Sequence, residues 1–215
     1  MATEIDRRPR SRRGEGEQLR EALIDAAEEL MLELGSAEKI SVRAVTARAG
    51  VSPTALYLHF ADREELLRAV CNRSFEELRT YVQSADEQHT GDPVAQMAAI
   101  GRAYIEFAEQ RPAAYRIAFT MPVGEGDMGA ELPEPPTGAE DPGIGACEIL
   151  LAAVARVSPG SGEDAVLETS IQLWAALHGF VTLRQAMPLF GWPDSERFLD
   201  GLWHAHYGIA GQAPA

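Results

Sequence analysis

The sequence predicts an all-α protein with a small N-terminal helical domain and a larger C-terminal helical domain. Apolar residues recur at three- and four-residue steps along most of the 215 residues, which is the period of helices packed on a core. Prolines and glycines divide these runs into separate helices, and we find neither an internal repeat nor a convincing strand pattern. With 46% apolar residues, the chain can bury a sizeable core.

Residues 1–16 are typical of a flexible basic arm, because five arginines stand among prolyl and glycyl breaks. Such an arm is either a solvated tail, in part a cloning remnant, or a segment that tracks phosphates or enters a minor groove, as homeodomain arms do. The first helix is expected at 17–34, where one face is apolar. Its apolar positions are Leu19, Leu23, Ala26, Ala27, Leu30, Met31 and Leu34, and Gly35 ends it.

The stretch from residue 41 to residue 67 organises the N-terminal domain, which we expect to cover 17–62. Ser41 is suited to cap a first short helix, and Gly50 allows a tight left-handed turn after it. Ser52 is placed to cap a second helix, with Pro53 at its first position and its end near Leu58. Two short helices joined by a glycine turn form a helix-turn-helix, whose second helix enters the DNA major groove.

The rest of the chain, 63–215, is expected to form the second domain. Asp62 and Glu65 make a capping pair for a long helix. The expected helices are 62–88, 92–110, 112–120, 144–157, 163–187 and 194–210, and the tail 211–215 is expected to fray. Residues 121–142 are rich in Gly, Pro and Glu and predict a mobile loop, either disordered or a functional lid.

Charge is distributed unevenly. Residues 1–70 carry 11 basic and 13 acidic side chains, a net −2, and residues 71–215 carry 8 and 20, a net −12, which together give −14. The acidic remainder would repel phosphate and keep non-specific DNA binding weak. The two cysteines match no metal spacing, and neither a secretory signal nor a bilayer-length apolar run is visible, so we expect a cytoplasmic protein with no membrane partner.

An enzyme is not expected, and we predict no catalytic residue, metal site or cofactor. The five histidines and two cysteines show none of the spacings that metal or nucleophile chemistry requires, and no phosphate-binding glycine loop is present. His204 and His206 are two residues apart, so they do not share a helical face.

The run from Ala49 to Leu67 resembles the DNA-binding signature of the TetR/AcrR family of bacterial transcriptional regulators. The shared residues are Ala49-Gly50-Val51-Ser52, Leu56-Tyr57, His59-Phe60 and the basic Arg63, where the family more often has lysine. A second resemblance, to one C-terminal domain type of the same family (the Trp…His-Gly type), rests on Trp174 with His178-Gly179 and on Arg111-Pro112-Ala113, Tyr115-Arg116 and Phe119. The resemblance implies a homodimer with a reading domain, a ligand domain and a helix from residue 62 that links them.

The predicted DNA-binding residues surround the second helix of the motif. Thr54 and Ala55 are expected to face base edges, where the hydroxyl can hydrogen-bond and the methyl can touch thymine. The helix start is formed by Ser52 and Pro53, and the phosphate contacts are assigned to Ser41, Arg43, Tyr57, His59 and Arg63. Tyr57 and His59 could instead be a core aromatic and a plain helix-end residue.

The C-terminal helices carry more large aromatics than the reading domain needs, which predicts an apolar pocket for a mostly apolar effector. The candidate lining is Tyr104, Phe107, Tyr115, Phe119, Trp174 and His178. Trp174 and His178 could also be ordinary core residues, and Gly179 leaves room for a ligand or for a close helix. No basic cluster lies among these positions, so a strongly anionic ligand is not expected.

The last helix carries a wide apolar stripe, which predicts a dimer interface through the last two long helices. The stripe is Phe198, Leu199, Leu202, Trp203 and His206. We therefore expect a homodimeric regulator that binds double-stranded operator DNA, most simply a repressor released by a small molecule. The alternatives are an activator and a ligand-independent DNA-binding or scaffold dimer.

Overall fold

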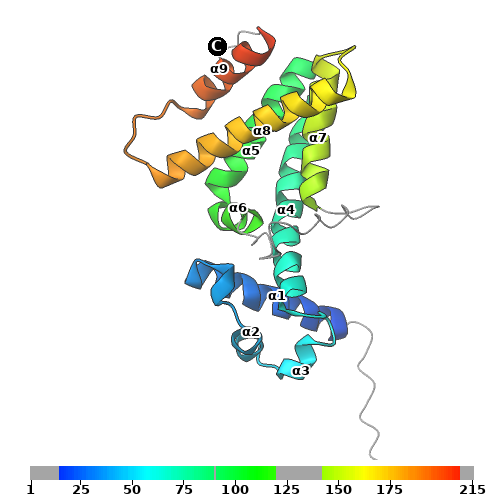
Figure 1. The fold of residues 1–215 in the computed structure, drawn as a ribbon, viewed down its shortest axis with the longest axis vertical. Coiled ribbons are helices and arrows are strands. Elements are labelled where there is room, and N and C mark those ends of the chain that lie inside the picture. The colour runs from blue at the N-terminus through cyan, green and yellow to red at the C-terminus, as the bar shows by residue number, and fades with distance from the viewer. Residues whose placement is uncertain (1–14, 90, 120–141, 209–215) are drawn as a thin grey trace, which may run out of the picture. The chain divides into compact units, whose positions relative to one another are not determined.

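The computed structural model describes residues 15–89, 91–119 and 142–208, and all regular structure within these ranges is helical (Figure 1). The predicted all-α class is confirmed. Most of the predicted arm and tail and nearly all of the predicted 121–142 loop lie outside the described residues. Within the described ranges, none of the helices combines the length and the apolar character that crossing a bilayer requires.

The described residues form two compact units, which divide after Cys71. The first unit contains α1 (Glu15–Leu34), the short 3-10 helix η1 (Ala37–Lys39), α2 (Val42–Arg48), α3 (Pro53–Leu56) and the beginning of α4 (Arg63–Gln88). Its core is apolar and buried, and consists of Leu23, Ile24, Ala27, Leu30, Ile40, Val45, Leu56, Phe60, Leu66, Leu67 and Val70. The predicted helix-turn-helix is therefore present, and α4 begins where the predicted boundary lies.

Local hydrogen bonds explain where these helices begin and end. The Ser41 hydroxyl accepts a bond from the Ala44 amide at 3.2 Å, as predicted for a cap, and Gly50 has a φ of 71°. Ser52 stands at the cap of α3 in extended conformation, but its side chain makes no capping bond. The helix α3 stops at Leu56, two residues before its predicted end, because the amides of Leu58 and His59 bond to carbonyls three positions back, in tight turns.

Arginine side chains hold the first unit together across its elements. The Arg48 guanidinium on α2 reaches Glu29 and Glu33 of α1 at 2.9 and 2.7 Å. At the start of α4, Arg63 donates to the carbonyls of Ile40 and Ala37 at 2.6 and 2.7 Å.

The third nitrogen of Arg63 pairs with Glu64 at 2.7 Å. All three guanidinium nitrogens of Arg63 are thus engaged within the chain, which does not support the phosphate contact predicted for this residue. Arg63 instead joins the start of α4 to the backbone of η1 and its C-cap residue, where the Ala37 carbonyl also accepts from the Ile40 amide at 3.1 Å.

The second unit is built from the remainder of α4 together with α5 (Pro93–Gln110), α6 (Pro112–Ala118), α7 (Pro142–Val157), α8 (Glu163–Ala186) and α9 (Ser195–Tyr207). The helix α5 is its centre and is buried on most sides. α7 and α8 pack on each other and on α5, and α9 also packs on α5, against Gly101 in the middle of that helix (Figure 1). Asp92 caps α5 through the amides of Val94 and Ala95, and Pro93 occupies the first position.

The apolar stripe of α9 already has a partner inside the chain. Leu199 and Trp203 are buried, and they seat against Gly101 of α5, where an added Cβ would lie 2.7 Å from Trp203 Cζ2 and 3.0 Å from Leu199 Cδ2. The argument that this stripe needs a second subunit therefore fails for these two residues. Phe198, Leu202 and His206 remain partly exposed, and Phe198 stacks on Phe180 with ring centroids 4.0 Å apart.

We expect Arg63→Ala to lower the free energy of unfolding by about 1–3 kcal/mol, because two charge-assisted bonds to backbone carbonyls are lost. Urea unfolding followed by circular dichroism measures the change. The matched control is Arg43→Ala on α2, since Arg43 is exposed and forms no ion pair with any described residue. It should stay within about 0.5 kcal/mol of the wild type. Equal stability of the two variants would contradict the structural role of Arg63.

We expect Gly101→Ala to destabilise the second unit by about 1–3 kcal/mol, because the new methyl group overlaps the Trp203 ring and must displace α9. Thermal unfolding and the emission of the buried indole report the effect. Gly191→Ala is the control, since a Cβ there meets no atom within 4 Å. A wild-type melting temperature for Gly101→Ala would show that α9 does not seat as described.

Candidate DNA interface and ligand cavity

The surface of α3 and the turn after it combines a fixed backbone with exposed side chains. Leu56 is fully buried and anchors α3, whereas Ser52, Pro53 and Thr54 are exposed and Ala55 is half-buried. Tyr57 is 56% exposed, which removes the alternative of a core aromatic. This is the arrangement of a reading helix, with its N-terminal polar side chains free to meet base edges.

Leu58 was not predicted as a contact residue, yet it is 77% exposed directly after α3. Its exposure was implied by spacing, because Leu56 and Leu58 are two residues apart and cannot both face the core. An exposed apolar side chain here can touch a thymine methyl. Sequence reasoning missed it because leucine in a periodic run is most simply assigned to a core.

The remaining predicted DNA-binding residues have different positions. The Ser41 hydroxyl is used as the cap of α2, and Arg63 is bound within the chain. Arg43 is exposed on α2, while His59 is half-buried, with its ring carbon 3.6 Å from where a Cβ on Gly16 would stand. Since Arg48 is paired with two glutamates, Arg43 is the cation of α2 available to a phosphate.

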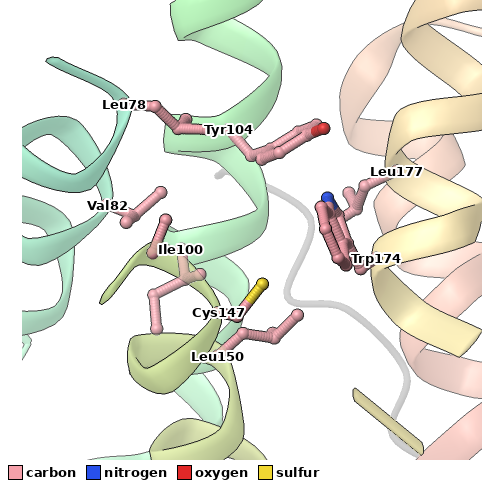
Figure 2. A pocket seen from close by; sticks show the side chains of 9 residues that line it. Leu78, Val82, Ile100, Tyr104, Cys147, Leu150, Trp174 and Leu177 are labelled. Carbon is pink, nitrogen blue, oxygen red and sulfur yellow. The ribbon is translucent and has the colours of Figure 1, made fainter. Parts of the chain in front are cut away.

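In the second unit a small cavity of about 30 Å³ lies between four helices (Figure 2). Its walls are almost entirely apolar: Leu78 and Val82 on α4, Ile100 and Tyr104 on α5, Ala146, Cys147 and Leu150 on α7, and Trp174 and Leu177 on α8. Such a volume holds one or two water molecules, whereas ligand pockets are typically about 300–1,000 Å³. A ligand could enter only if the helices moved apart.

Two of the six predicted pocket residues line this cavity, Tyr104 and Trp174. Tyr115, Phe119 and His178 form a contiguous aromatic cluster beside them, with Phe119 centred 4.5 Å from the His178 ring and 6.4 Å from the Trp174 ring. Phe107 is fully buried on another side of α5, where it packs edge-on against Tyr81 at 5.3 Å. Its assignment to the cavity lining is therefore corrected, because it is a core residue.

Hydrogen bonds join the polar ends of this cluster. The Tyr115 hydroxyl lies 2.8 Å from His178 Nδ1 and 3.2 Å from the Tyr104 hydroxyl, and Tyr104 lies 3.3 Å from the same nitrogen. Thr182 Oγ1 is 3.4 Å from His178 Nε2. Burial raises the pKa of both tyrosines and lowers the pKa of His178, so the cluster is uncharged at neutral pH.

Sequence reasoning missed the contributions of α4 and α7. The apolar periodicity of α4 was recognised, but Leu78 and Val82 were assigned to no site, and the alanine-rich α7 offered no aromatic signal. Which of several apolar positions faces a void depends on how four helices cross, and local sequence carries no such signal.

A second hollow in the same unit is larger but open. It measures about 840 Å³ and lies between α5, α6, α8 and the connector 187–194, beside the ion pair of Arg184 with Glu109 at 2.9 Å. Ligand sites usually bury most of the ligand surface, which an open groove does not do. The smaller and less open cavity among the aromatics is therefore the candidate ligand site.

Several large apolar side chains of α8 are exposed among polar residues such as Glu168 and Gln172, and no element of the described chain covers them. Leu167, Ile171 and Leu183 are between 46 and 54% exposed, and Ala175 lies between them on the same side. A Cβ added to Gly179 on α8 or Gly201 on α9 would meet no atom within 4 Å. Large apolar side chains that stay exposed on one helix indicate a candidate contact surface.

The described residues contain no group of three or more His, Cys, Asp or Glu side chains placed to hold a metal ion.

Residues 23–70 match the model of the family described as "Bacterial regulatory proteins, tetR family". Residues 97–206, just over half of the chain, match "Tetracyclin repressor-like, C-terminal domain".

An uncharacterised HTH-type transcriptional regulator of Mycobacterium tuberculosis is 26% identical over 164 residues, which cover 76% of this chain and 69% of that protein. A Rhodococcus sp. RHA1 protein of unknown function superimposes with a TM-score of 0.65 at 26% identity, over 90% of this chain and 96% of the other.

NalD, the secondary repressor of the MexAB-OprM multidrug efflux pump in Pseudomonas aeruginosa, superimposes with a TM-score of 0.59 at 20% identity, over 87% of this chain and 95% of NalD. These proteins are transcription regulators or share their fold, and the family is not one of enzymes. With its helix-turn-helix and its larger helical C-terminal domain both matched, the chain belongs to the TetR family and is a DNA-binding transcription regulator.

Proposed function

We propose that the protein is a homodimeric repressor that leaves its operator when a small, mostly apolar effector enlarges the cavity of the second unit. The observation that carries the proposal is the course of α4. This one helix begins at Arg63 among the elements of the first unit, which contains the helix-turn-helix. Further along, it places Leu78 and Val82 in the cavity wall. A ligand that pushes on these two side chains acts on a helix whose first turns belong to the reading unit.

On DNA, α3 would lie in the major groove with Thr54 and Ala55 at base edges and Leu58 near thymine methyls. Arg43 and Tyr57, which are exposed on either side of the turn, would contact phosphates, with Ser52, Pro53 and His59 at the edges of the same surface. The acidic second unit would limit non-specific binding, so affinity would depend on these few contacts. A DNA-bound protein of this kind acts in the cytoplasm.

The second subunit would cover the exposed apolar side chains of α8 together with the exposed part of α9. Gly179 and Gly201 leave open space on this surface, which allows two helix backbones to approach closely. In a C2 dimer the same face meets itself, and the two reading helices would contact half-sites about 34 Å apart or further. Phe198, Leu202 and His206 would contribute from α9, while Leu199 and Trp203 support it from inside the subunit.

The proposed release of the protein from operator DNA depends on the small size of the cavity. A volume of about 30 Å³ is too small for an effector, so binding selects a conformation in which the four helices stand further apart. The effector lowers DNA affinity only if the reading units are wrongly spaced in that conformation. Because the similar NalD is a repressor, repression relieved by an effector is favoured over activation. In an effector-independent DNA-binding or scaffold dimer, the cavity would not enlarge.

We expect Thr54→Ala and Arg43→Ala to weaken DNA binding in different ways. Loss of the Thr54 hydroxyl should cost about 1–3 kcal/mol at one base pair and alter sequence preference. Loss of the Arg43 charge should weaken binding to all sequences about equally and reduce the salt slope by about one. Fluorescence anisotropy on an operator selected from a random DNA library, over a salt series, measures both effects.

Arg43→Lys is the control for charge and should retain the salt slope. We expect Thr54→Ala and Arg43→Ala to keep wild-type unfolding curves, because neither side chain packs in the core. The orientation of α3 would be wrong if Thr54→Ala weakened every sequence equally or if Arg43→Ala changed base preference.

We expect Ile171→Glu to convert the dimer into a folded monomer, because a carboxylate replaces one of the exposed apolar side chains of α8. Ile171 is 54% exposed in the single chain, so the subunit itself should remain folded. Sedimentation velocity at micromolar concentration measures the mass. Ala155→Glu, at an exposed position of α7, is the control and should sediment as the wild type does. A wild-type protein that sediments as a monomer would refute the homodimer.

A further inference from the structure

We infer that the effector is an uncharged molecule with an apolar body and one hydroxyl or carbonyl oxygen, and that this oxygen binds between the Trp174 indole nitrogen and the Tyr104 hydroxyl. The inference rests on the proposed function, since it assigns the chemistry of the molecule that enlarges the cavity. It adds a polar anchor point to a site described so far only as apolar.

Charge is excluded by the cavity wall. Its lining holds no Lys, Arg, Asp, Glu or His side chain, and its polar surface comes from Tyr104 and Trp174 with the Cys147 sulfur. The nearest ionisable group of the adjoining cluster, His178, is held neutral by burial, which lowers its pKa. A carboxylate or an ammonium group placed here would lose its hydration and find no opposite charge, which is far more costly than placing a neutral group.

The hydrogen bonds around Tyr104 run in one direction. Trp174 Nε1 can only donate, so it cannot accept the Tyr104 proton, and both side chains line the cavity. The Tyr104 proton must then go to Tyr115 at 3.2 Å or to His178 Nδ1 at 3.3 Å, and Tyr115 donates to that nitrogen at 2.8 Å.

Neutral His178 then carries its proton on Nε2, which faces Thr182 Oγ1 at 3.4 Å. In the opposite direction, a proton on Nδ1 would leave one of the two tyrosine protons without an acceptor among these contacts, because the two hydroxyls cannot donate to each other at once. We assign the first arrangement, because it satisfies every donor in the chain of groups.

This direction determines what a ligand can offer. The Tyr104 proton is engaged away from the cavity, so the cavity presents one donor, the Trp174 N–H, and one remaining acceptor, the Tyr104 oxygen. Both atoms lie at the same edge of the cavity (Figure 2). A ligand hydroxyl inserted between them accepts from the indole and donates to the tyrosine. A ligand carbonyl accepts from the indole alone, and a hydrocarbon does neither.

The test uses four probes with one naphthalene body, namely 1-(2-naphthyl)ethanol, 2-acetylnaphthalene, 2-ethylnaphthalene and 2-naphthoate. Binding to the full chain without DNA is measured by isothermal titration calorimetry and by thermal shift. We expect the ketone to bind about five-fold tighter than the hydrocarbon, which corresponds to one net hydrogen bond, and the alcohol to bind tighter than the ketone because it also donates to Tyr104. The carboxylate should bind at least ten-fold more weakly than the ketone.

Two variants separate the donor from the acceptor. Trp174→Phe removes the only donor, so the ketone should lose its advantage over the hydrocarbon. Tyr104→Phe removes the acceptor and leaves the indole N–H in place, so the ketone should bind as tightly as before, while the alcohol loses its advantage over the ketone. Trp192→Phe is the matched control, because that indole donates to the Met187 carbonyl on the connector, away from the cavity.

The outcomes distinguish this inference from the proposed function. Preferential binding of the carboxylate, or equal binding of ketone and hydrocarbon, overturns the assigned chemistry and leaves an effector-controlled repressor intact. Weaker ketone binding in Tyr104→Phe overturns the hydrogen-bond direction. Failure of all four probes to bind overturns both the inference and the effector site. If the ketone binds as expected but the operator complex is equally stable with it, the inference stands and the release mechanism fails.

Discussion

The constraint on which the rest depends is that α4 must satisfy two cores along one helix. Leu66, Leu67 and Val70 are buried in the first unit, while Leu78 and Val82 are buried in the second and reach the cavity. Its first turn is held by a reciprocal capping pair, in which Asp62 accepts from the Glu65 amide at 2.6 Å and Glu65 accepts from the Ala61 amide, and by the Arg63 bonds to η1. A helix held so firmly at its start has little freedom to absorb movement there.

The cavity and its neighbours show how a buried region can be both stable and responsive. Apolar walls and a void of about 30 Å³ cost little in the closed state, since few packing contacts are missing. Beside the void, the hydroxyl and imidazole groups of the Tyr104–Tyr115–His178 cluster are buried with their partners satisfied, as buried polar groups must be. A ligand that offers a replacement partner can therefore enter without leaving an unpaired buried group.

In the second unit, some apolar side chains on the outer helices are covered by other elements of the chain, and others are exposed. On α9, Leu199 and Trp203 pack against α5 at Gly101. The position of α9 and the stability of the subunit therefore depend on the absence of a side chain at this glycine. On α8, the outward residues have no such partner among the described residues. Exposed apolar side chains of this size fit a contact surface better than a solvated one.

Local patterns in the sequence were sufficient for the helices, their caps and the reading motif. These features act through hydrogen bonds and backbone angles within a few residues, as at Ser41, Gly50, Pro53 and the Asp62–Glu65 pair. Such local effects can be predicted from the sequence. The roles of Arg63, Phe107 and Leu199 were decided by tertiary structure. Whether a guanidinium meets a phosphate or a carbonyl 26 residues away, and whether an aromatic ring faces a void or a neighbouring ring, depends on how distant helices cross. Periodicity marks the buried side of each helix, but it does not say which other helix covers that side.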